Sequence, residues 1–253
     1  MGRSIVEAAT LPAVRPHRVL LPLMAALALV AVPAGCGDAD EGSGDAGGQG
    51  TAPQSTAETS ASAPAGKCRA VDAPRAKRDG GQKKPKGKLD PAKTYDVVFQ
   101  TSCGSFTIRL DVKTSPATAA SFASLAKKGF FDDTGFHRIV PGFVIQGGDP
   151  TGTGTGGPGY STVDRPPAGT AYTTGVVAMA KTAQEAPGTS GSQFYVVTGQ
   201  DAQLPPEYAL LGKVVKGIEV TQEIGELGDP ASGGSGTPTQ AVVIEKATVR
   251  ERP

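Results

Sequence analysis

Residues 136–149 read FHRIVPGFVIQGGD, and residues 191–198 read GSQFYVVT. Both stretches are apolar enough to form buried strands, yet Arg138 and Gln146 interrupt the first and Gln193 the second. A buried arginine or glutamine costs free energy unless it is fully hydrogen-bonded, so a plain core seldom keeps one. The placement of these polar residues in apolar strands indicates that the two strands line a functional site.

Alternation of apolar and polar residues predicts further strands. From Tyr95 to Leu110 it continues on both sides of the turn TSCG, which is typical of a hairpin with one buried face. Ser115 and Pro116 predict the start of a helix that runs to Lys128. We expect a second helix near residues 218–227 and further strands at residues 142–146, 175–180, 193–198, 210–215 and 242–249. Many short strands with few helices indicate a mainly β fold, either a barrel or a sandwich.

The composition divides the chain into a linker and one folded domain. Residues 37–92 hold almost no large apolar side chain, first in a Gly/Ser/Pro-rich tract and then in a Lys/Arg-rich one. Such a segment buries too little surface to offset its ordering entropy, so we expect a disordered linker there and a domain over residues 93–253. The basic run from Lys67 to Lys93 either contacts anionic lipid or is simply solvated. The net charge of +1 argues against binding nucleic acid.

Residues 1–36 are typical of a signal peptide. Basic residues precede the apolar run VLLPLMAALALVAVPAG, which is short for a transmembrane helix and contains prolines. Ala34 and Gly35 before Cys36 resemble a bacterial lipobox, whose cysteine carries lipid. Pro33 stands where an aliphatic residue is usual, so ordinary cleavage after Ala34 remains an alternative. We therefore expect an extracytoplasmic protein that is anchored to the cell membrane through Cys36, or else a secreted one.

The two remaining cysteines form a candidate disulfide. If Cys36 carries lipid, Cys68 and Cys103 remain as a pair in an oxidising compartment. A bond between them would close a loop of about 35 residues and stabilise the fold by roughly 3–4 kcal/mol on the chain-entropy model. It would also tie the end of the linker to the first hairpin. The alternative is two unrelated thiols.

Two other motifs carry no chemistry of their own. The run GTGTGG at residues 152–157 fits the dinucleotide-binding pattern, but proline and glycine follow it instead of a helix. Ser190 and Ser192 suggest a nucleophile, yet the sequence has no nucleophile elbow, and the mature chain has one histidine, His137. One histidine and scattered cysteines do not make an ordinary zinc site, so we expect neither metal nor cofactor.

The two quoted stretches closely resemble the signature segments of the cyclophilins, the peptidyl-prolyl cis–trans isomerases, and the resemblance runs from about Tyr95 to the end of the chain. It implies a closed antiparallel eight-stranded β-barrel with a helix capping each end. The family's catalytic arginine falls on Arg138. The resemblance places the substrate groove at Phe143, Val144, Gln146, Ala180, Lys181, Gln193, Phe194, Tyr195, Gln203, Leu204 and Tyr208, with Phe194 packing behind it.

Three groove positions depart from the commonest family pattern. Tyr195 stands where phenylalanine is usual, and its buried hydroxyl needs a partner or water. Gln203 stands where many members have tryptophan, and Tyr208 where histidine is common. The last two departures bear on affinity and sequence preference rather than on the reaction.

The resemblance implies that the reaction is rotation about X–Pro bonds, which needs no nucleophile, metal or cofactor. The barrier of about 18–20 kcal/mol is the amide resonance lost on twisting. The twisted nitrogen gains a lone pair, to which the permanently charged fork of Arg138 can donate while an apolar pocket holds the ring. We expect a monomer that acts on proline-containing segments of exported proteins, whose folding can wait on this step.

Two other functions stay open. The groove could belong to a non-catalytic chaperone module that binds proline peptides on a membrane tether, although Arg138 argues against it. The chain could also be a tethered binder of a small solute. The absence of a two-lobed α/β pattern opposes that second alternative.

Overall fold

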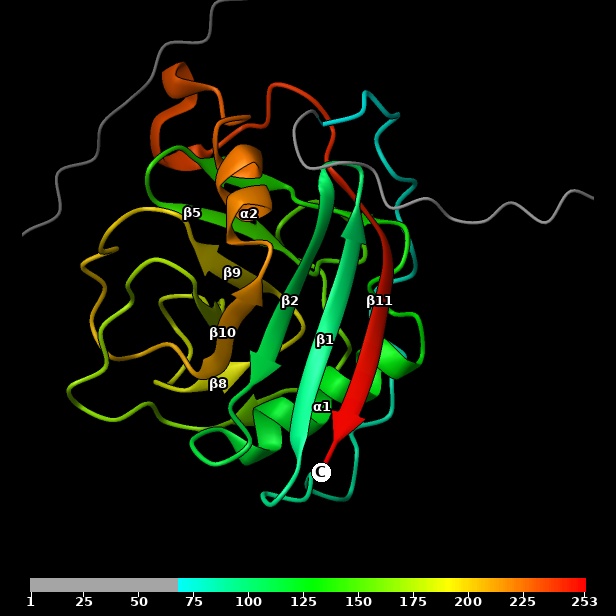
Figure 1. Ribbon diagram of the computed structural model, residues 1–253, viewed down its shortest axis with the longest axis vertical. Coiled ribbons are helices and arrows are strands. Elements are labelled where there is room, and N and C mark those ends of the chain that lie inside the picture. The colour runs from blue at the N-terminus through cyan, green and yellow to red at the C-terminus, as the bar shows by residue number, and fades with distance from the viewer. Residues whose placement is uncertain (1–67) are drawn as a thin grey trace, which may run out of the picture. The chain divides into compact units, whose positions relative to one another are not determined.

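The structure is a computed structural model that describes residues 68–253. The expected signal peptide, Cys36 and the first part of the expected linker lie outside the described residues. In the described part, a curled antiparallel sheet accompanied by few helices forms the fold (Figure 1). The prediction of a mainly β fold is confirmed.

The main sheet contains nine strands in the order β3-β11-β1-β2-β10-β7-β9-β5-β4. Their bounds are β1 Thr94–Thr101, β2 Gly104–Leu110, β3 Thr134–Gly135, β4 Arg138–Val140, β5 Val144–Gly147, β7 Val176–Met179, β9 Phe194–Val197, β10 Leu210–Lys216 and β11 Val243–Arg252. The strands β6 (Thr162–Val163) and β8 (Thr189–Ser190) form a separate pair.

The resemblance implied eight strands in a closed barrel, whereas the hydrogen-bonded ladder counts nine strands and ends at β3 and β4. Only Phe136 and His137 separate these two short end strands in the chain. A link of only two residues keeps the end of β3 close to the start of β4. Because these are the first and last strands of the ladder, the sheet has to curl to bring them near each other. The site strand β4 is therefore an end of the ladder that the fold brings back to its beginning.

The two helices lie at opposite ends of the strands (Figure 1). Helix α1 spans Pro116–Lys127, with Ser115 before it and a proline in its first turn, close to the expected bounds. Helix α2 spans Ile218–Gly225, two residues shorter than expected. A short 3₁₀ helix, η1 at Pro230–Ser235, was not predicted; the carboxylate of Asp229 accepts a hydrogen bond from the backbone N–H of Ala231 at its start.

Alternation along β9 separates two apolar clusters. Phe194 and Val196 face the main core, where Phe194 packs against Phe99 with 5.4 Å between ring centres. Tyr195 and Val197 point the other way, into a second cluster with Val144, Tyr172, Ala178 and Ala202. Successive side chains of a strand point to opposite faces, so one strand supports both the core and the surface above it.

Residues 68–92 form what we call the amino-terminal arm, and they correct the expectation of a disordered linker in this part. The arm has no helix or strand, but it lies against the domain. Four backbone N–H groups of the arm donate hydrogen bonds to backbone carbonyls of the domain. The pairs are Arg69 with Ser102 (2.8 Å), Lys77 with Pro150 (2.7 Å), Gly80 with Gly157 (2.9 Å) and Gln82 with Pro158 (3.0 Å). Low apolar content did not reveal this, because much of what holds the arm is hydrogen bonding by its backbone and by Lys77, with only Cys68 and Leu89 packed against the core.

The structure also contains a disulfide between Cys68, at the start of the arm, and Cys103, in the turn between β1 and β2. This is the pairing that the cysteine count suggested. None of the helices within residues 68–253 is long and apolar enough to cross a membrane.

Candidate active site

Three paired strands bring the predicted polar residues together. Arg138 of β4 lies opposite Gln146 of β5, and Gln146 lies opposite Tyr195 of β9. Residues directly opposite one another on antiparallel strands project to the same face of the sheet. The register therefore places Arg138, Gln146 and Tyr195 in one row across the sheet.

A pocket of about 260 Å³ opens over this row, and we call it the Arg138 pocket. Its lining consists of Arg138, Phe143, Val144, Gln146, Ala180, Lys181, Tyr195, Leu204 and Tyr208. All nine were predicted as catalytic or substrate-binding residues. Six of the nine are apolar or aromatic, and Arg138, Lys181 and Gln146 add two cations and an amide, which is the character of a small-ligand site.

The guanidinium of Arg138 is held in place from two sides. Its central carbon lies 5.8 Å from the centre of the Phe143 ring, and its Nε donates to the carbonyl of Gly234 in η1 at 3.1 Å. Within residues 68–253 its two terminal nitrogens make no hydrogen bond. Burial lowers the pKa of Arg138, an effect that the neighbouring Tyr208 opposes, but an arginine remains charged at neutral pH. Arg138 thus presents charged donors to the pocket.

Tyr195 and Tyr208 form the aromatic side of this pocket, and the buried Tyr172 packs behind them. The hydroxyl of Tyr172 donates to the carbonyl of Tyr208 at 2.7 Å and accepts from its N–H at 3.0 Å. The rings of Tyr195 and Tyr208 meet edge to face, with 5.7 Å between their centres. The buried hydroxyl of Tyr195 finds no partner within the described residues. Burial raises the pKa of Tyr195 well above its usual value, and Tyr172 and Tyr208 add to the rise.

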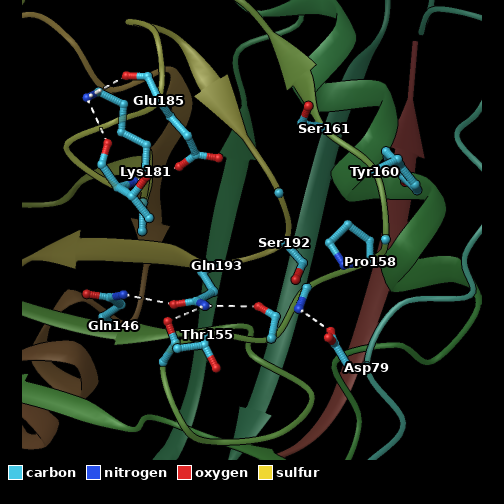
Figure 2. A pocket seen from close by; sticks show the side chains of 17 residues that line it. Asp79, Gln146, Thr155, Pro158, Tyr160, Ser161, Lys181, Glu185, Ser192 and Gln193 are labelled. Carbon is cyan, nitrogen blue, oxygen red and sulfur yellow. Dashed lines mark hydrogen bonds between the residues drawn. The ribbon is translucent and has the colours of Figure 1, made fainter.

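A second pocket, of about 580 Å³, adjoins the first, and we call it the Gln193 pocket (Figure 2). The two pockets share Gln146, Ala180 and Lys181. Gln146 Nε2 donates to Gln193 Oε1 at 3.0 Å, and Gln193 Nε2 donates to the carbonyls of Gly154 and Gly156, both at 2.9 Å. An extended peptide seated in the first pocket can therefore continue into the second.

Asp149 shapes the glycine-rich loop beside the Gln193 pocket. Its buried carboxylate accepts hydrogen bonds from the N–H groups of Thr151 (2.7 Å), Gly154 (2.6 Å) and Gly156 (3.1 Å). Burial acts to raise the pKa of Asp149, but these bonds and one from the Thr151 hydroxyl outweigh it, so the pKa falls below its usual value. Sequence reasoning missed this role, although an Asp-Pro pair before a Gly/Thr-rich run is a recognised turn signal.

Lys181 stands between the two pockets with its side chain only 4% exposed. Its Nζ lies 3.2 Å from a carboxylate oxygen of Glu207 and donates to the carbonyls of Thr182 (3.3 Å) and Glu185 (3.2 Å). A buried ammonium is tolerated when it is paired in this way. Lys181 therefore serves as a neutralised part of the wall.

Two predicted groove residues line neither pocket. Phe194 is fully buried in the main core, where it supports the pockets from behind and cannot contact a substrate. Gln203 is exposed, adopts a left-handed backbone with φ of 51°, and donates its N–H to Asp201 Oδ1 at 2.9 Å. Gln203 thus lies beside the Arg138 pocket, next to its lining residue Leu204.

His137 and the acidic residues suggest no metal site. No group of three or more His, Cys, Asp or Glu side chains in the described chain could hold a metal ion. The imidazole of His137 is buried, and neither of its nitrogens has a hydrogen-bond partner among the described residues.

Comparisons with known proteins show which family this chain resembles. The family model described as "Cyclophilin type peptidyl-prolyl cis-trans isomerase/CLD" matches residues 96–249. A "Peptidyl-prolyl cis-trans isomerase-like 1" of Aspergillus fumigatus is 38% identical over 160 residues, covering 62% of this chain and 96% of that protein. A "Probable peptidyl-prolyl cis-trans isomerase A" of Mycobacterium bovis is 34% identical over 175 residues, covering 63% and 94% respectively.

A solved structure is similar to this chain in fold as well as in sequence. A Cryptosporidium parvum cyclophilin type peptidyl-prolyl cis-trans isomerase, crystallised in the presence of the dipeptide Ala-Pro, superposes with a TM-score of 0.55 at 31% sequence identity. The match covers 61% of this chain and 98% of that one.

Proposed function

The chain belongs to the cyclophilin-type peptidyl-prolyl cis–trans isomerases, and from this premise we propose that it isomerises X–Pro bonds in exported polypeptides and so accelerates their folding. The pairing of a charged donor with an apolar ring at the mouth of the Arg138 pocket supports this function most directly. The guanidinium carbon of Arg138 lies 5.8 Å from the centre of the Phe143 ring. A proline ring packed on Phe143 would bring its nitrogen into reach of the guanidinium.

The chemistry follows from what changes during rotation. In the planar amide the prolyl nitrogen shares its lone pair with the carbonyl, and in the twisted state that lone pair becomes an acceptor. Arg138 Nε is occupied by Gly234, so the terminal nitrogens would donate to the twisted nitrogen. A bond that forms only in the transition state lowers the barrier without tightening ground-state binding.

The glutamines would hold one side of the rotating bond. Gln146 gives a side-chain N–H to Gln193, and within the described residues its Oε1 accepts no hydrogen bond. That oxygen is available to an N–H of the substrate backbone. Fixing the backbone on one side while the other side turns supplies the orientation that a rotation needs.

We place the substrates among exported proteins because of the first 36 residues and the disulfide. The sequence of residues 1–36 supports export and a lipid anchor on Cys36. A disulfide between Cys68 and Cys103 is typical of a protein that works in an oxidising compartment. Newly exported chains fold there, and slow X–Pro isomerisation can limit their folding rate.

The direct test is isomerisation of a short X–Pro peptide, followed by a protease that cleaves only the trans form. The uncatalysed process takes about 10–100 s at 25 °C. We expect catalytic amounts of the mature protein to shorten it in proportion to enzyme concentration. A protein that binds the peptide without accelerating the exchange would instead be a non-catalytic chaperone module.

A further inference from the structure

The amino-terminal arm passes beside the Gln193 pocket, and all of it precedes residue 96, where the match to the family model begins. Along the glycine-rich loop, the arm makes three backbone hydrogen bonds, from Lys77 to Pro150, from Gly80 to Gly157 and from Gln82 to Pro158. Lys84 Nζ adds a bond to the carbonyl of Ser161 at 2.8 Å. The arm therefore forms an outer support for the loop that lines this pocket.

Asp79 is the one arm residue that lines the pocket itself (Figure 2). Its Oδ1 accepts a hydrogen bond from the N–H of Gly157 at 2.8 Å. The carbonyl of Gly156, which belongs to the same peptide group, accepts from Gln193 Nε2 at 2.9 Å. A peptide group is planar, so Asp79 on one side fixes the direction of the acceptor that Gln193 uses on the other.

Asp79 holds the N–H of a peptide group that has room to shift. A Cβ built on Gly157 would meet nothing within 4 Å, so no neighbouring atom would stop this residue from moving outward. The carbonyl of Gly157 accepts from the N–H of Gly80 and the carbonyl of Gly156 from Gln193, so losing the Asp79 bond would tilt the peptide group rather than release it. A carboxylate that accepts from the N–H also polarises the group and strengthens its carbonyl as an acceptor. From Gln193 the network passes to Gln146, which lies opposite Arg138.

We propose that Asp79 is a positioning residue for the isomerase reaction, acting through the Gly156–Gly157 peptide group on Gln193. It sets the Gln193 pocket for the substrate residues that flank the proline, while the Arg138 pocket binds the proline itself. The inference rests on the proposed function. The arm thereby becomes part of the enzyme's binding surface rather than a spacer before it.

The test compares Asp79→Ala, Asp79→Asn and the control Asp72→Ala in the mature protein. Asp72 lies on the same arm and is exposed, and its side chain makes no hydrogen bond within the described residues. Each variant is assayed on a short capped X–Pro peptide and on a peptide extended by three residues on both sides of the X–Pro unit. The short peptide fills the Arg138 pocket, whereas the extended one also reaches the Gln193 pocket.

We expect Asp79→Ala to raise KM for the extended peptide by about two- to tenfold, the range that one hydrogen bond accounts for. Its KM for the short peptide should rise less than its KM for the extended one, and kcat should change less than KM, because the Arg138 pocket itself is intact. Asp79→Asn should have a KM for the extended peptide close to that of the unmodified protein, because its amide oxygen accepts the same bond. Asp72→Ala should behave as the unmodified protein.

An independent readout is the side-chain amide of Gln193 in a ¹⁵N-correlated NMR spectrum. Its resonances should move in Asp79→Ala and stay in place in Asp72→Ala. Unmoved resonances, an unchanged KM for the extended peptide, or equal losses on both peptides with a lower Tm would overturn the inference. If the unmodified protein accelerated neither peptide, the proposed function itself would fail, which is a different result.

Discussion

The guanidinium carbon of Arg138 lies 5.8 Å from the centre of the Phe143 ring, which places a permanent charge at the edge of an apolar pocket. We expect Arg138→Ala to lower kcat/KM for an X–Pro peptide at least tenfold, equal to about 1.4 kcal/mol of transition-state stabilisation. The protease-coupled isomerisation assay measures the loss, and a native circular dichroism spectrum is the control. Unchanged turnover by a folded variant would refute the mechanism.

The sequence allowed Arg138, Gln146 and Gln193 to be predicted as site residues because polar residues in apolar strands stand out against their neighbours. The same alternation places Phe194 and Tyr195 on opposite faces of one strand. The resemblance placed both residues at the substrate groove with Phe194 packing behind it, and the strand period explains that division. Only Tyr195 lines the Arg138 pocket.

The arm could not be predicted by the same reasoning. Three of its contacts with the glycine-rich loop are made by backbone groups of Lys77, Gly80 and Gln82, and almost every residue type provides such groups. Composition measures how much apolar surface a segment can bury, and it carries no information on such bonds. The role of Asp79 depends on which loop lies beside the arm, and that is a property of the tertiary fold.

Tyr195→Phe should leave activity intact and raise the free energy of unfolding by about 1–3 kcal/mol. The buried hydroxyl of Tyr195 has no partner among the described residues, so its removal ends a desolvation cost. Tyr172→Phe is the matched control, because it deletes a hydroxyl with two hydrogen bonds to the backbone of Tyr208 and should destabilise the fold. Urea unfolding compares the three proteins. A loss of stability in Tyr195→Phe would mean that a bound water satisfies the hydroxyl.

His137 should make the fold less stable in mild acid. Burial lowers its pKa below the usual 6.5, opposed by Asp149 and reinforced by Arg138. With a lowered pKa, the folded state binds fewer protons than the unfolded state at pH values below about 6.5. Stability is therefore complete above that pH and falls as the pH drops towards the folded pKa.

The measurement for His137 is the urea midpoint between pH 7.5 and pH 5. The only other histidine of the chain, His17, falls in the expected signal peptide, so His137→Gln should flatten the profile in this window. An equally steep profile in His137→Gln would assign the acid sensitivity to other groups. The bonded carboxylate of Asp149 titrates below this range, because its pKa is lowered from 3.8.

Cys36 should determine where the protein resides. The lipobox-like end of the signal predicts an acylated amino terminus that partitions with membranes, and Cys36→Ser should be released or left unprocessed. The intact mass of the mature amino terminus distinguishes lipidation of Cys36 from ordinary cleavage after Ala34. A free Gly35 terminus without lipid would show that Pro33 diverts the chain to ordinary signal cleavage.

The disulfide between Cys68 and Cys103 should couple the arm to the stability of the domain. The two cysteines are 35 residues apart, and closing a loop of that length stabilises a fold by roughly 3–4 kcal/mol on the chain-entropy model. Non-reducing peptide mapping of exported protein should find the two cysteines linked. Cys68→Ser and Cys103→Ser should each lower the free energy of unfolding by a similar amount, and their double variant should lose no more than either single one. A double variant with additive losses would show that each thiol contributes by packing rather than through a shared bond.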